Sequence, residues 1–281
     1  MKKYDLHTHT IASDGTYTVR ELLERAKENG LKGIAITDHD TIDGLEEAEK
    51  VAKEIGIELI PGIEFSCNLG DNEIHILGYF VDYKNAKIIE ELYNLDKIRK
   101  ERNLKIIEKL KKYKLYITEE EIQEEATGNI VSKAHIANLL VKKGYVYSRR
   151  DAFKQYLGST GVAYVKKENF KPEDAVKIIK ENGGIAVVAH PKLISTNDNT
   201  VESIVENLKK IGLDGIEAEY SSFTLEDVIK YRKMAQKYDL IITGGSDFHG
   251  KNREGVDLGD QGITEEEYEI LKNKKRSGGQ L

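Results

Sequence analysis

The sequence predicts an α/β fold in which seven strands and their intervening helices close a barrel, with a helical insertion domain in one crossover. Short runs rich in β-branched residues alternate with amphipathic helical stretches, which is the pattern of βαβ units. The chain has 281 residues, a length that suits one such barrel with an insertion. One long segment breaks the alternation and is expected to be the insertion.

Strands and helices are expected where apolar residues repeat with the corresponding period. The expected strands span residues 3–9, 33–38, 57–64, 74–81, 184–190, 214–218 and 240–246. The expected barrel helices span residues 19–29, 45–55, 172–182, 201–210 and 225–238. Several of these helices end at an asparagine or a glycine, which are common helix-stop residues.

Residues 85–165 carry helical patterns at 87–112 and 134–143 without a strong strand between them. A segment of about eighty residues is long for one crossover between neighbouring strands, so we interpret it as a helical insertion. A run of ordinary barrel helices is the alternative. The barrel would then consist of two parts, residues 1–84 and 166–272.

The composition is that of a globular chain with a moderate negative charge. Hydrophobic residues make up 39% of the chain and charged residues 33%, which allows a sizeable core. The formal net charge of −6 argues against a protein that coats extended nucleic acid, because that mode needs a basic surface. A small nucleotide or a short RNA stays allowed as a substrate.

The ends of the chain and its cysteine content bear on location. The chain begins MKKYDLHTHT, without an apolar signal region, and no run approaches membrane-spanning length. Cys67 is the single cysteine and cannot form an intramolecular disulfide. We therefore expect a cytoplasmic protein with no membrane partner, and the sequence indicates no obligate protein partner. Residues 273–281 have no apolar period and are expected to form a flexible tail.

Potential metal ligands follow the first two expected strands. His7 and His9 stand two residues apart at the end of a strand, so both rings leave the same face. Asp14 follows in the motif ASDG, where Gly15 allows a tight turn back toward the histidines. The motif TDHD then places His39 and its flanking aspartates directly after the next strand. Barrel sites are built at such C-terminal strand ends.

Further strands end in the same way, at Glu64, at His190, and at Asp247 with His249. His75 is the exception, because it falls early in its expected strand. Any one of these residues alone could as well be a capping aspartate or a hydrogen-bonded histidine. However, six of the seven histidines lie at or beside strands, and this coincidence favours a metal site. Imidazole and carboxylate ligands suit zinc, manganese or iron, and the lack of cysteine clusters argues against a thiolate site.

Seven motifs occur in order along the chain: DLHTHT, SDG, ITDHD, GIEFS, EIHILGY, VVAHP and GGSDFHG. Through this ordered set the chain resembles the polymerase and histidinol phosphatase family, usually called PHP. The segments VSKAHIANLLV and YLGSTGVAYV extend the resemblance across the insertion, to the branch of small stand-alone phosphoesterases that act on nucleotides.

The resemblance implies a distorted seven-stranded β/α barrel of the PHP type that binds two or three divalent ions of manganese, iron or zinc. The residues that match ligands of the first ion are His7, His9, Glu64 and Asp247. Those that match the second ion are Glu64, His75 and His190, so that Glu64 bridges the pair. Those that match the third are Asp14, His39 and His249. Asp38 and Asp40 also match acidic positions, and we expect them to orient His39 from behind.

The resemblance also implies that the insertion caps the metal cleft and contacts substrate phosphate. The matching residues are Arg99, Arg102, Lys133 and His135. Lys133 stands where relatives more often have arginine. An ammonium group therefore replaces the planar guanidinium there, and it cannot form the paired hydrogen bonds by which arginine binds phosphate. Arg99 and Arg102 have an equal alternative as solvated residues of a charged helix. A lone helical histidine is more often structural, but the resemblance gives His135 a role toward the substrate. In the catalytic step, either His135 or a metal-bound water would protonate the departing oxygen.

These patterns together predict a metal-dependent phosphoesterase acting on nucleotides, with 3',5'-bisphosphates, nucleoside monophosphates and the 5' ends of short RNAs as candidate substrates. Clustered divalent ions lower the pKa of a bound water from about 15.7 toward roughly 7, so a metal-bound hydroxide would attack phosphorus while Glu64 bridges two ions. A histidinol-phosphate phosphatase is one alternative. A non-catalytic nucleotide-binding regulatory module is another, although such proteins usually lose ligands.

Overall fold

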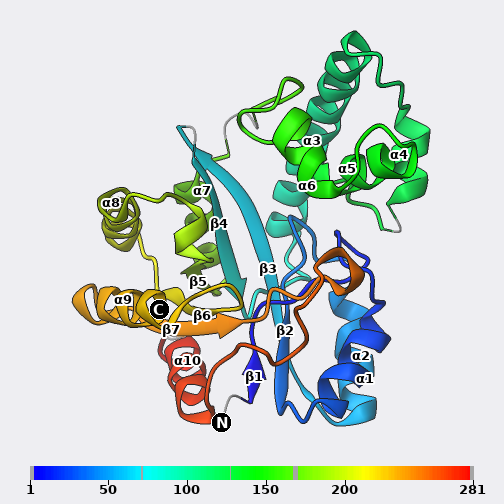
Figure 1. Ribbon diagram of the computed structural model, residues 1–281. Coiled ribbons are helices and arrows are strands. Elements are labelled where there is room, and N and C mark those ends of the chain that lie inside the picture. The colour runs from blue at the N-terminus through cyan, green and yellow to red at the C-terminus, as the bar shows by residue number, and fades with distance from the viewer. Residues whose placement is uncertain (1–2, 71, 127, 167–169, 279–281) are drawn as a thin grey trace.

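A computed structural model of the chain describes residues 3–70, 72–126, 128–166 and 170–278, and it shows one seven-stranded sheet with the strands in sequence order. The strands are β1 (Tyr4–Asp5), β2 (Gly33–Ile36), β3 (Glu58–Leu69), β4 (Asn72–Tyr79), β5 (Ile185–Val188), β6 (Gly215–Tyr220) and β7 (Ile241–Gly245). The edge strands meet, since the Leu6 amide donates to the Gly244 carbonyl at 3.1 Å. The sheet therefore curls into a nearly closed barrel, and the expected fold class is confirmed (Figure 1).

The strand β4 runs antiparallel to both of its neighbours, so the expectation of an all-parallel barrel is wrong at this strand. The cause is local: β3 and β4 are joined by a tight hairpin in which Leu69 pairs with Asn72, and Gly70 adopts a φ of 63°. A hairpin needs no crossover helix. As a result, the first residues of β4 lie at the edge where the parallel strands end.

Five helices cover the outside of the barrel, with their apolar faces against the sheet. They are α1 (Val19–Glu28), α2 (Leu45–Ile55), α7 (Pro172–Glu181), α8 (Asp198–Lys210) and α9 (Leu225–Lys237). In Figure 1, α1 and α2 lie together on one side and α8 and α9 on the other. The ends of these helices follow local signals, for example the capping box of Thr18 and Glu21 at α1 and the left-handed Gly56 after α2.

The helix α10 (Glu265–Gly278) packs against the side chains that fill the interior of the barrel. The ring of Tyr268 stacks on that of Tyr4 with centroids 3.9 Å apart, and Leu271 is fully buried in the same cluster. The expected flexible tail is therefore wrong for residues 273–278, which continue a helix anchored by its first turns. Residues 279–281 lie outside the described part of the chain.

Between β4 and α7 the chain forms a separate helical lobe, drawn in green in Figure 1. It contains α3 (Ala86–Lys112), α4 (Glu119–Glu125), α5 (Lys133–Lys142), α6 (Arg149–Ala152) and a π-helical turn (Phe153–Leu157). Its side chains pack into a core of their own, which includes Ile106, Leu110, Ile136, Leu140 and Leu157. We call this lobe the insertion. Within the described residues, no helix is both long and apolar enough to cross a membrane.

Candidate functional site

The carboxylate of Glu64, on β3, lies at the centre of five imidazoles. His7 Nε2 and His9 Nε2 are each 3.2 Å from Glu64 Oε2, and His39 Nδ1 is 3.1 Å from the same oxygen. The other oxygen, Oε1, is 2.9 Å from His75 Nδ1 and 3.0 Å from His190 Nε2. Glu64 is completely buried. The reversed direction of β4 explains how His75, early in its strand, reaches the same place.

The remaining candidates complete the cluster around this centre. Asp247 Oδ1 lies 3.1 Å from His9 Nε2, and Asp14 Oδ1 lies 3.2 Å from His249 Nε2. Three sets bring their ligand atoms within 4.8 Å of one another: His7, His9, Glu64 and Asp247; His39, Glu64 and His75; His9, Asp14, His39 and His249. All nine residues proposed as ligands are thus brought together, with His190 joined to the cluster through Glu64.

The bonding of these groups fits a bound cation. Several buried atoms have no hydrogen-bond partner in the described part of the chain: His7 Nε2, both ring nitrogens of His9, Asp14 Oδ1, Glu64 Oε2 and His75 Nε2. Buried polar atoms are rarely left in that state, because each costs desolvation energy. A divalent cation is bound by nitrogen and oxygen lone pairs that point toward one place and are not occupied by hydrogen bonds.

The electrostatics of the cluster point the same way. Burial raises the pKa of Glu64, but the imidazoles of His39 and His7 outweigh it and lower that pKa well below its usual range. Burial would lower the pKa of His75, yet the charge of Glu64 raises it to about 10. The cluster thus balances its carboxylates with positive charge, and a bound metal ion brings that charge in place of the protons.

Three residues that the sequence patterns did not single out support the ligands. Glu217, on β6, accepts from His7 Nδ1 at 3.0 Å and from the His190 amide at 2.7 Å. The Tyr220 hydroxyl donates to Asp247 Oδ2 at 2.8 Å, and Arg253 also pairs with this carboxylate. Such partners fix the tautomer and orientation of a ligand. The signal available in the sequence for Glu217 was a glutamate inside the expected strand 214–218, and the structure shows it fully buried in β6.

The aspartates on either side of His39 have other roles than the expected one. Asp38 accepts from the Thr10 amide at 2.8 Å, the Thr10 hydroxyl at 2.7 Å and the Ser13 hydroxyl at 2.5 Å. It therefore fixes the loop that carries Asp14, and the expectation that it orients His39 is corrected. Asp40 accepts from the Ser66 amide at 2.9 Å and pairs with Arg99 of the insertion.

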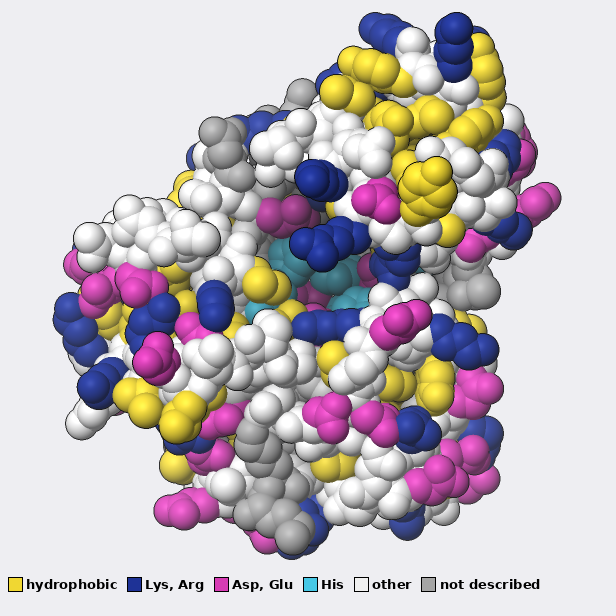
Figure 2. All heavy atoms as spheres, in the orientation of Figure 1, with side chains coloured by type: hydrophobic (Ala, Val, Ile, Leu, Met, Phe, Trp, Pro, Cys, Tyr) yellow, Lys and Arg dark blue, Asp and Glu magenta, His cyan; other side chains and the backbone are white. Residues whose placement is uncertain are grey.

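A cavity of about 270 Å³ lies between the barrel cluster and the insertion. Asp14, His39 and His75 line it from the barrel, while the lining residues of the insertion include Arg99, Arg102, Ser132, Lys133 and Arg149. We call it the cationic cavity. Figure 2 shows the histidines at the floor of a hollow between the two lobes, with lysine and arginine side chains around it.

Two of the predicted phosphate-binding cations are already paired. Arg99, 5% exposed, forms its ion pair with Asp40, which is equally buried. Lys133 Nζ lies 3.2 Å from Glu73 Oε2 on β4. His135 does not line the cavity: it is 3% exposed, and its Nδ1 accepts from the Ser132 amide at 3.1 Å. Burial lowers the pKa of His135, which favours the neutral ring.

Arg102 and Arg149 differ, because neither forms an ion pair with a carboxylate of the described residues. Arg102 is 8% exposed, and burial together with the nearby charge of Arg99 lowers its pKa to about 10. The Nε atoms of both arginines have no hydrogen-bond partner among the described residues. Arg149, which sequence reasoning missed, donates through Nη1 to the Asn252 carbonyl of the barrel. In the part of the chain that the structure describes, Arg102 donates only to the neutral Asn103 side chain, at 3.3 Å. Buried cations without a carboxylate partner are costly, so the cavity suits an anion.

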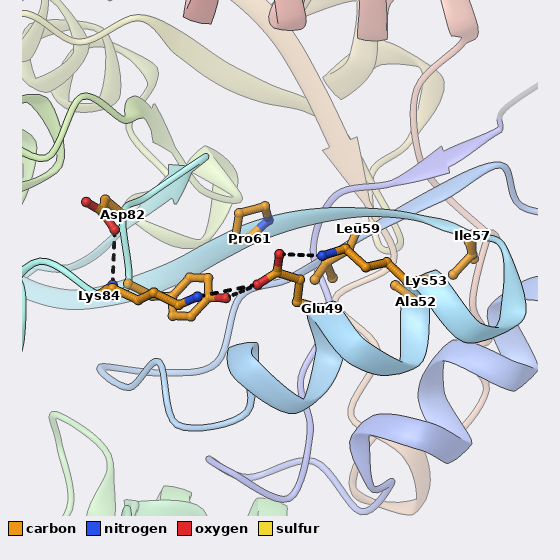
Figure 3. A pocket seen from close by; sticks show the side chains of 9 residues that line it. Glu49, Ala52, Lys53, Ile57, Leu59, Pro61, Asp82 and Lys84 are labelled. Carbon is orange, nitrogen blue, oxygen red and sulfur yellow. Dashed lines mark hydrogen bonds and ion pairs between the residues drawn. The ribbon is translucent and has the colours of Figure 1, made fainter.

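A further cavity of about 460 Å³ lies on the outer wall of the barrel (Figure 3). It is lined by α2, β3 and the segment after β4, and none of the nine candidate ligands contributes to it. Lys53 and Tyr83 both bind Glu49 there and hold the pKa of this carboxyl at about 2. Its polar groups are paired with one another, in contrast to the cationic cavity.

A buried set of imidazoles and carboxylates at one end of an α/β barrel, next to an anion-binding cavity, defines a metal-dependent hydrolase. The chain belongs to the PHP domain family, whose domain matches residues 5–212. The recognised motifs and the fold agree with this assignment, and the protein is a metal-dependent phosphoesterase of that family.

Similar proteins span nearly the whole chain. A 5'-3' exoribonuclease of Haemophilus influenzae is 38% identical over 91% of this chain and 96% of its own length. A 3',5'-nucleoside bisphosphate phosphatase of Chromobacterium violaceum is 31% identical over 92% of this chain and 91% of its own. A solved structure of an amidohydrolase from Chromobacterium violaceum matches with a TM-score of 0.88 at 29% identity, over 97% of this chain and 96% of that one. The insertion is therefore shared with these relatives.

Proposed function

We propose that the protein hydrolyses the phosphate ester on the 3' oxygen of nucleotides that also carry a 5' phosphate. The observation that carries this proposal is the pair of unpaired arginines, Arg102 and Arg149, in the same cavity as His39 and His75. A phosphate held by the arginines leaves a second phosphate of the same nucleotide at the metal cluster. The insertion then acts as the substrate cap.

The names of two relatives support a substrate that carries both a 5' phosphate and a phosphate ester on the 3' oxygen. A 3',5'-nucleoside bisphosphate and the 5'-phosphorylated end of a short RNA share one structure: a nucleoside with a 5' phosphate and a phosphate ester on its 3' oxygen. The relatives named as a 3',5'-nucleoside bisphosphate phosphatase and a 5'-3' exoribonuclease fit substrates of this kind. One site could therefore serve both reactions.

We propose that the cluster holds two or three divalent ions of manganese, iron or zinc. The first would be held by His7, His9, Glu64 and Asp247, the second by Glu64, His75 and His190, and the third by Asp14, His39 and His249. Ions of this kind supply hydroxide near neutral pH and neutralise charge that develops on phosphate oxygens. Glu64, in reach of five imidazoles, is the bridging carboxylate in this assignment.

His135 is proposed to give a proton to the departing 3' oxygen. Its Nδ1 accepts the Ser132 N–H, so a neutral ring carries its proton on Nε2. Ser132 itself lines the cationic cavity, with its hydroxyl 3.5 Å from Asp14 Oδ2. His135 is thus hydrogen-bonded to a residue of the cavity wall, which supports a role beside the substrate.

A phosphate-release screen of manganese-loaded protein tests the proposal. Its substrates are a nucleoside 3',5'-bisphosphate, a nucleoside monophosphate, histidinol phosphate, and one short RNA with either a 5' phosphate or a 5' hydroxyl; RNA cleavage is followed by mononucleotide release. We expect the bisphosphate and the 5'-phosphorylated RNA to exceed the others by roughly tenfold to a hundredfold, because only they use the arginines. Preference for histidinol phosphate would contradict the proposal, and tight nucleotide binding without any release would indicate a non-catalytic module.

A further inference from the structure

The proposed metal ligands also line a second cavity, to which the insertion contributes none of the lining residues given by the structure. Its volume is about 330 Å³, and its lining residues are His39, Glu64, Glu73, His75, His190, Leu193, Tyr220, Asp247 and His249. It shares His39, Glu73 and His75 with the cationic cavity, so the two cavities meet at the cluster. No lysine or arginine is among these lining residues. We call it the neutral cavity.

Apart from the candidate ligands, the lining residues of the neutral cavity in the described part of the chain are Glu73, Leu193 and Tyr220. Tyr220 is buried and engaged with Asp247, whereas the Leu193 side chain is 58% exposed. Leu193 is held firmly, because its amide donates to the His190 carbonyl at 2.9 Å in the 3-10 turn Pro191–Leu193. The backbone that carries this exposed apolar side chain is thus held three residues after a proposed metal ligand, and the side chain lines the cavity.

We infer that the neutral cavity receives the downstream nucleoside of an RNA substrate and that Leu193 packs against its base. This inference rests on the proposed function. Because no lysine or arginine lines this cavity, it is less suited to a second phosphate than the cationic cavity, whereas an apolar surface suits the face of a base. The proposed site of the 5' phosphate is the other cavity, so the chain of the substrate would pass the metal ligands from one cavity to the other.

The chemistry requires a place for this nucleoside. In hydrolysis of the diester, an oxygen from water bonds to phosphorus and the P–O3' bond breaks. The 3' oxygen leaves with a proton, and the phosphate stays on the 5' oxygen of the downstream nucleoside. This nucleoside is therefore attached to phosphorus throughout the reaction, whereas a bisphosphate has none. The product carries a new 5' phosphate, which is the group that the cationic cavity selects.

Leu193→Ala tests the inference, with Leu225→Ala as the matched control, since Leu225 on α9 is 75% exposed and lines neither cavity. Each variant is assayed, with manganese, on a nucleoside 3',5'-bisphosphate and on a 5'-phosphorylated dinucleotide with the same first nucleoside. We expect Leu193→Ala to raise the KM for the dinucleotide roughly fivefold, with no change for the bisphosphate. Leu193→Phe should restore the KM, because an aromatic ring stacks on a base.

Other outcomes would contradict either the inference about Leu193 alone or the proposed function as well. Equal changes for both substrates would place Leu193 against the first nucleoside, and no change for either would remove it from the substrate; both overturn the inference alone. A wild-type protein that cleaves neither substrate would overturn the proposed function and this inference together.

Discussion

The mouth of the barrel and the insertion both contribute polar residues to the cleft, but they do so in different ways. In the barrel, every residue proposed as a ligand from the sequence reaches one cluster around Glu64. In the insertion, Arg99 and Lys133 are paired with carboxylates, whereas Arg102 and the unforeseen Arg149 are not. The ends of neighbouring strands meet at one edge of the sheet, so their ligands converge. Whether an arginine or lysine on a helix is free to bind substrate depends on whether another element brings a carboxylate next to it. In the proposed function, metal binding therefore belongs to the barrel, and selection of the second phosphate belongs to part of the insertion.

The largest effect is expected from Glu64→Gln, which keeps the shape of the side chain but removes its charge. Glu64 contacts five imidazoles, so its loss disturbs more than one proposed ion. We expect kcat/KM to fall by more than about a hundredfold and the metal content to fall with it. His135→Ala should lower turnover less and leave the metal content unchanged. Equal turnover and metal content in Glu64→Gln and the wild type would contradict the assignment to the barrel.

A smaller and substrate-dependent effect is expected from Arg102→Ala. The variant should lose roughly tenfold to a hundredfold in kcat/KM for a 3',5'-bisphosphate, because a charge-assisted hydrogen bond to phosphate is removed. Hydrolysis of p-nitrophenyl phosphate, which has no second phosphate, should change little. Lys100→Ala is the control from the same helix, since Lys100 is exposed and pairs with Asp96. If both substrates are affected equally, the cationic cavity does not select a second phosphate.

Glu217→Gln should weaken metal binding rather than substrate selection. Its carboxylate accepts from His7 and from the His190 amide, and an amide cannot accept well from both. We expect manganese affinity to fall by about tenfold, measured by titration of the metal-free protein. Glu219→Gln on the same strand, where the carboxylate binds Arg232, serves as the control. An unchanged affinity in Glu217→Gln would limit this residue to a packing role.

The smallest effect on catalysis is expected from Arg99→Ala, whose consequence should be on stability. Removing one partner of the buried Arg99–Asp40 pair costs about 3–5 kcal/mol, measured by denaturant unfolding. The ratio of kcat/KM for the bisphosphate to that for p-nitrophenyl phosphate should stay within about threefold of the wild type. Adding Asp40→Asn should recover part of the stability. A ratio that falls as far as in Arg102→Ala would make Arg99 a substrate contact.

The sequence predicts the barrel well, and it also predicts which imidazoles and carboxylates gather at one end of it, because each depends on local signals. Apolar runs mark the strands, and a ligand directly after a run lies at the shared edge of the sheet. His75 is found by its motif, but its geometry depends on the hairpin that reverses β4, and the hydrophobic pattern alone does not show that reversal.

The pairing of charges between distant elements is what the sequence does not reveal. Arg99 and Asp40 are separated by 59 positions, and Lys133 and Glu73 by 60. Nothing near Asp38 shows that it binds Thr10 and Ser13. Backbone conformation is hidden in the same way: Asp40, His190 and Asp247 have φ values of 51°, 26° and 56°. Such strained residues persist only where the surrounding structure holds them, and these three lie at the site.

The most direct test of the central claim, that the barrel cluster is a metal centre, is elemental analysis of the purified protein after reconstitution with manganese, iron or zinc. We predict two or three ions per chain in the wild type and in Arg102→Ala, with a clear loss in Glu64→Gln, because the ligands lie in the barrel and the arginine does not contribute to them. A wild-type content below one ion per chain would contradict the account.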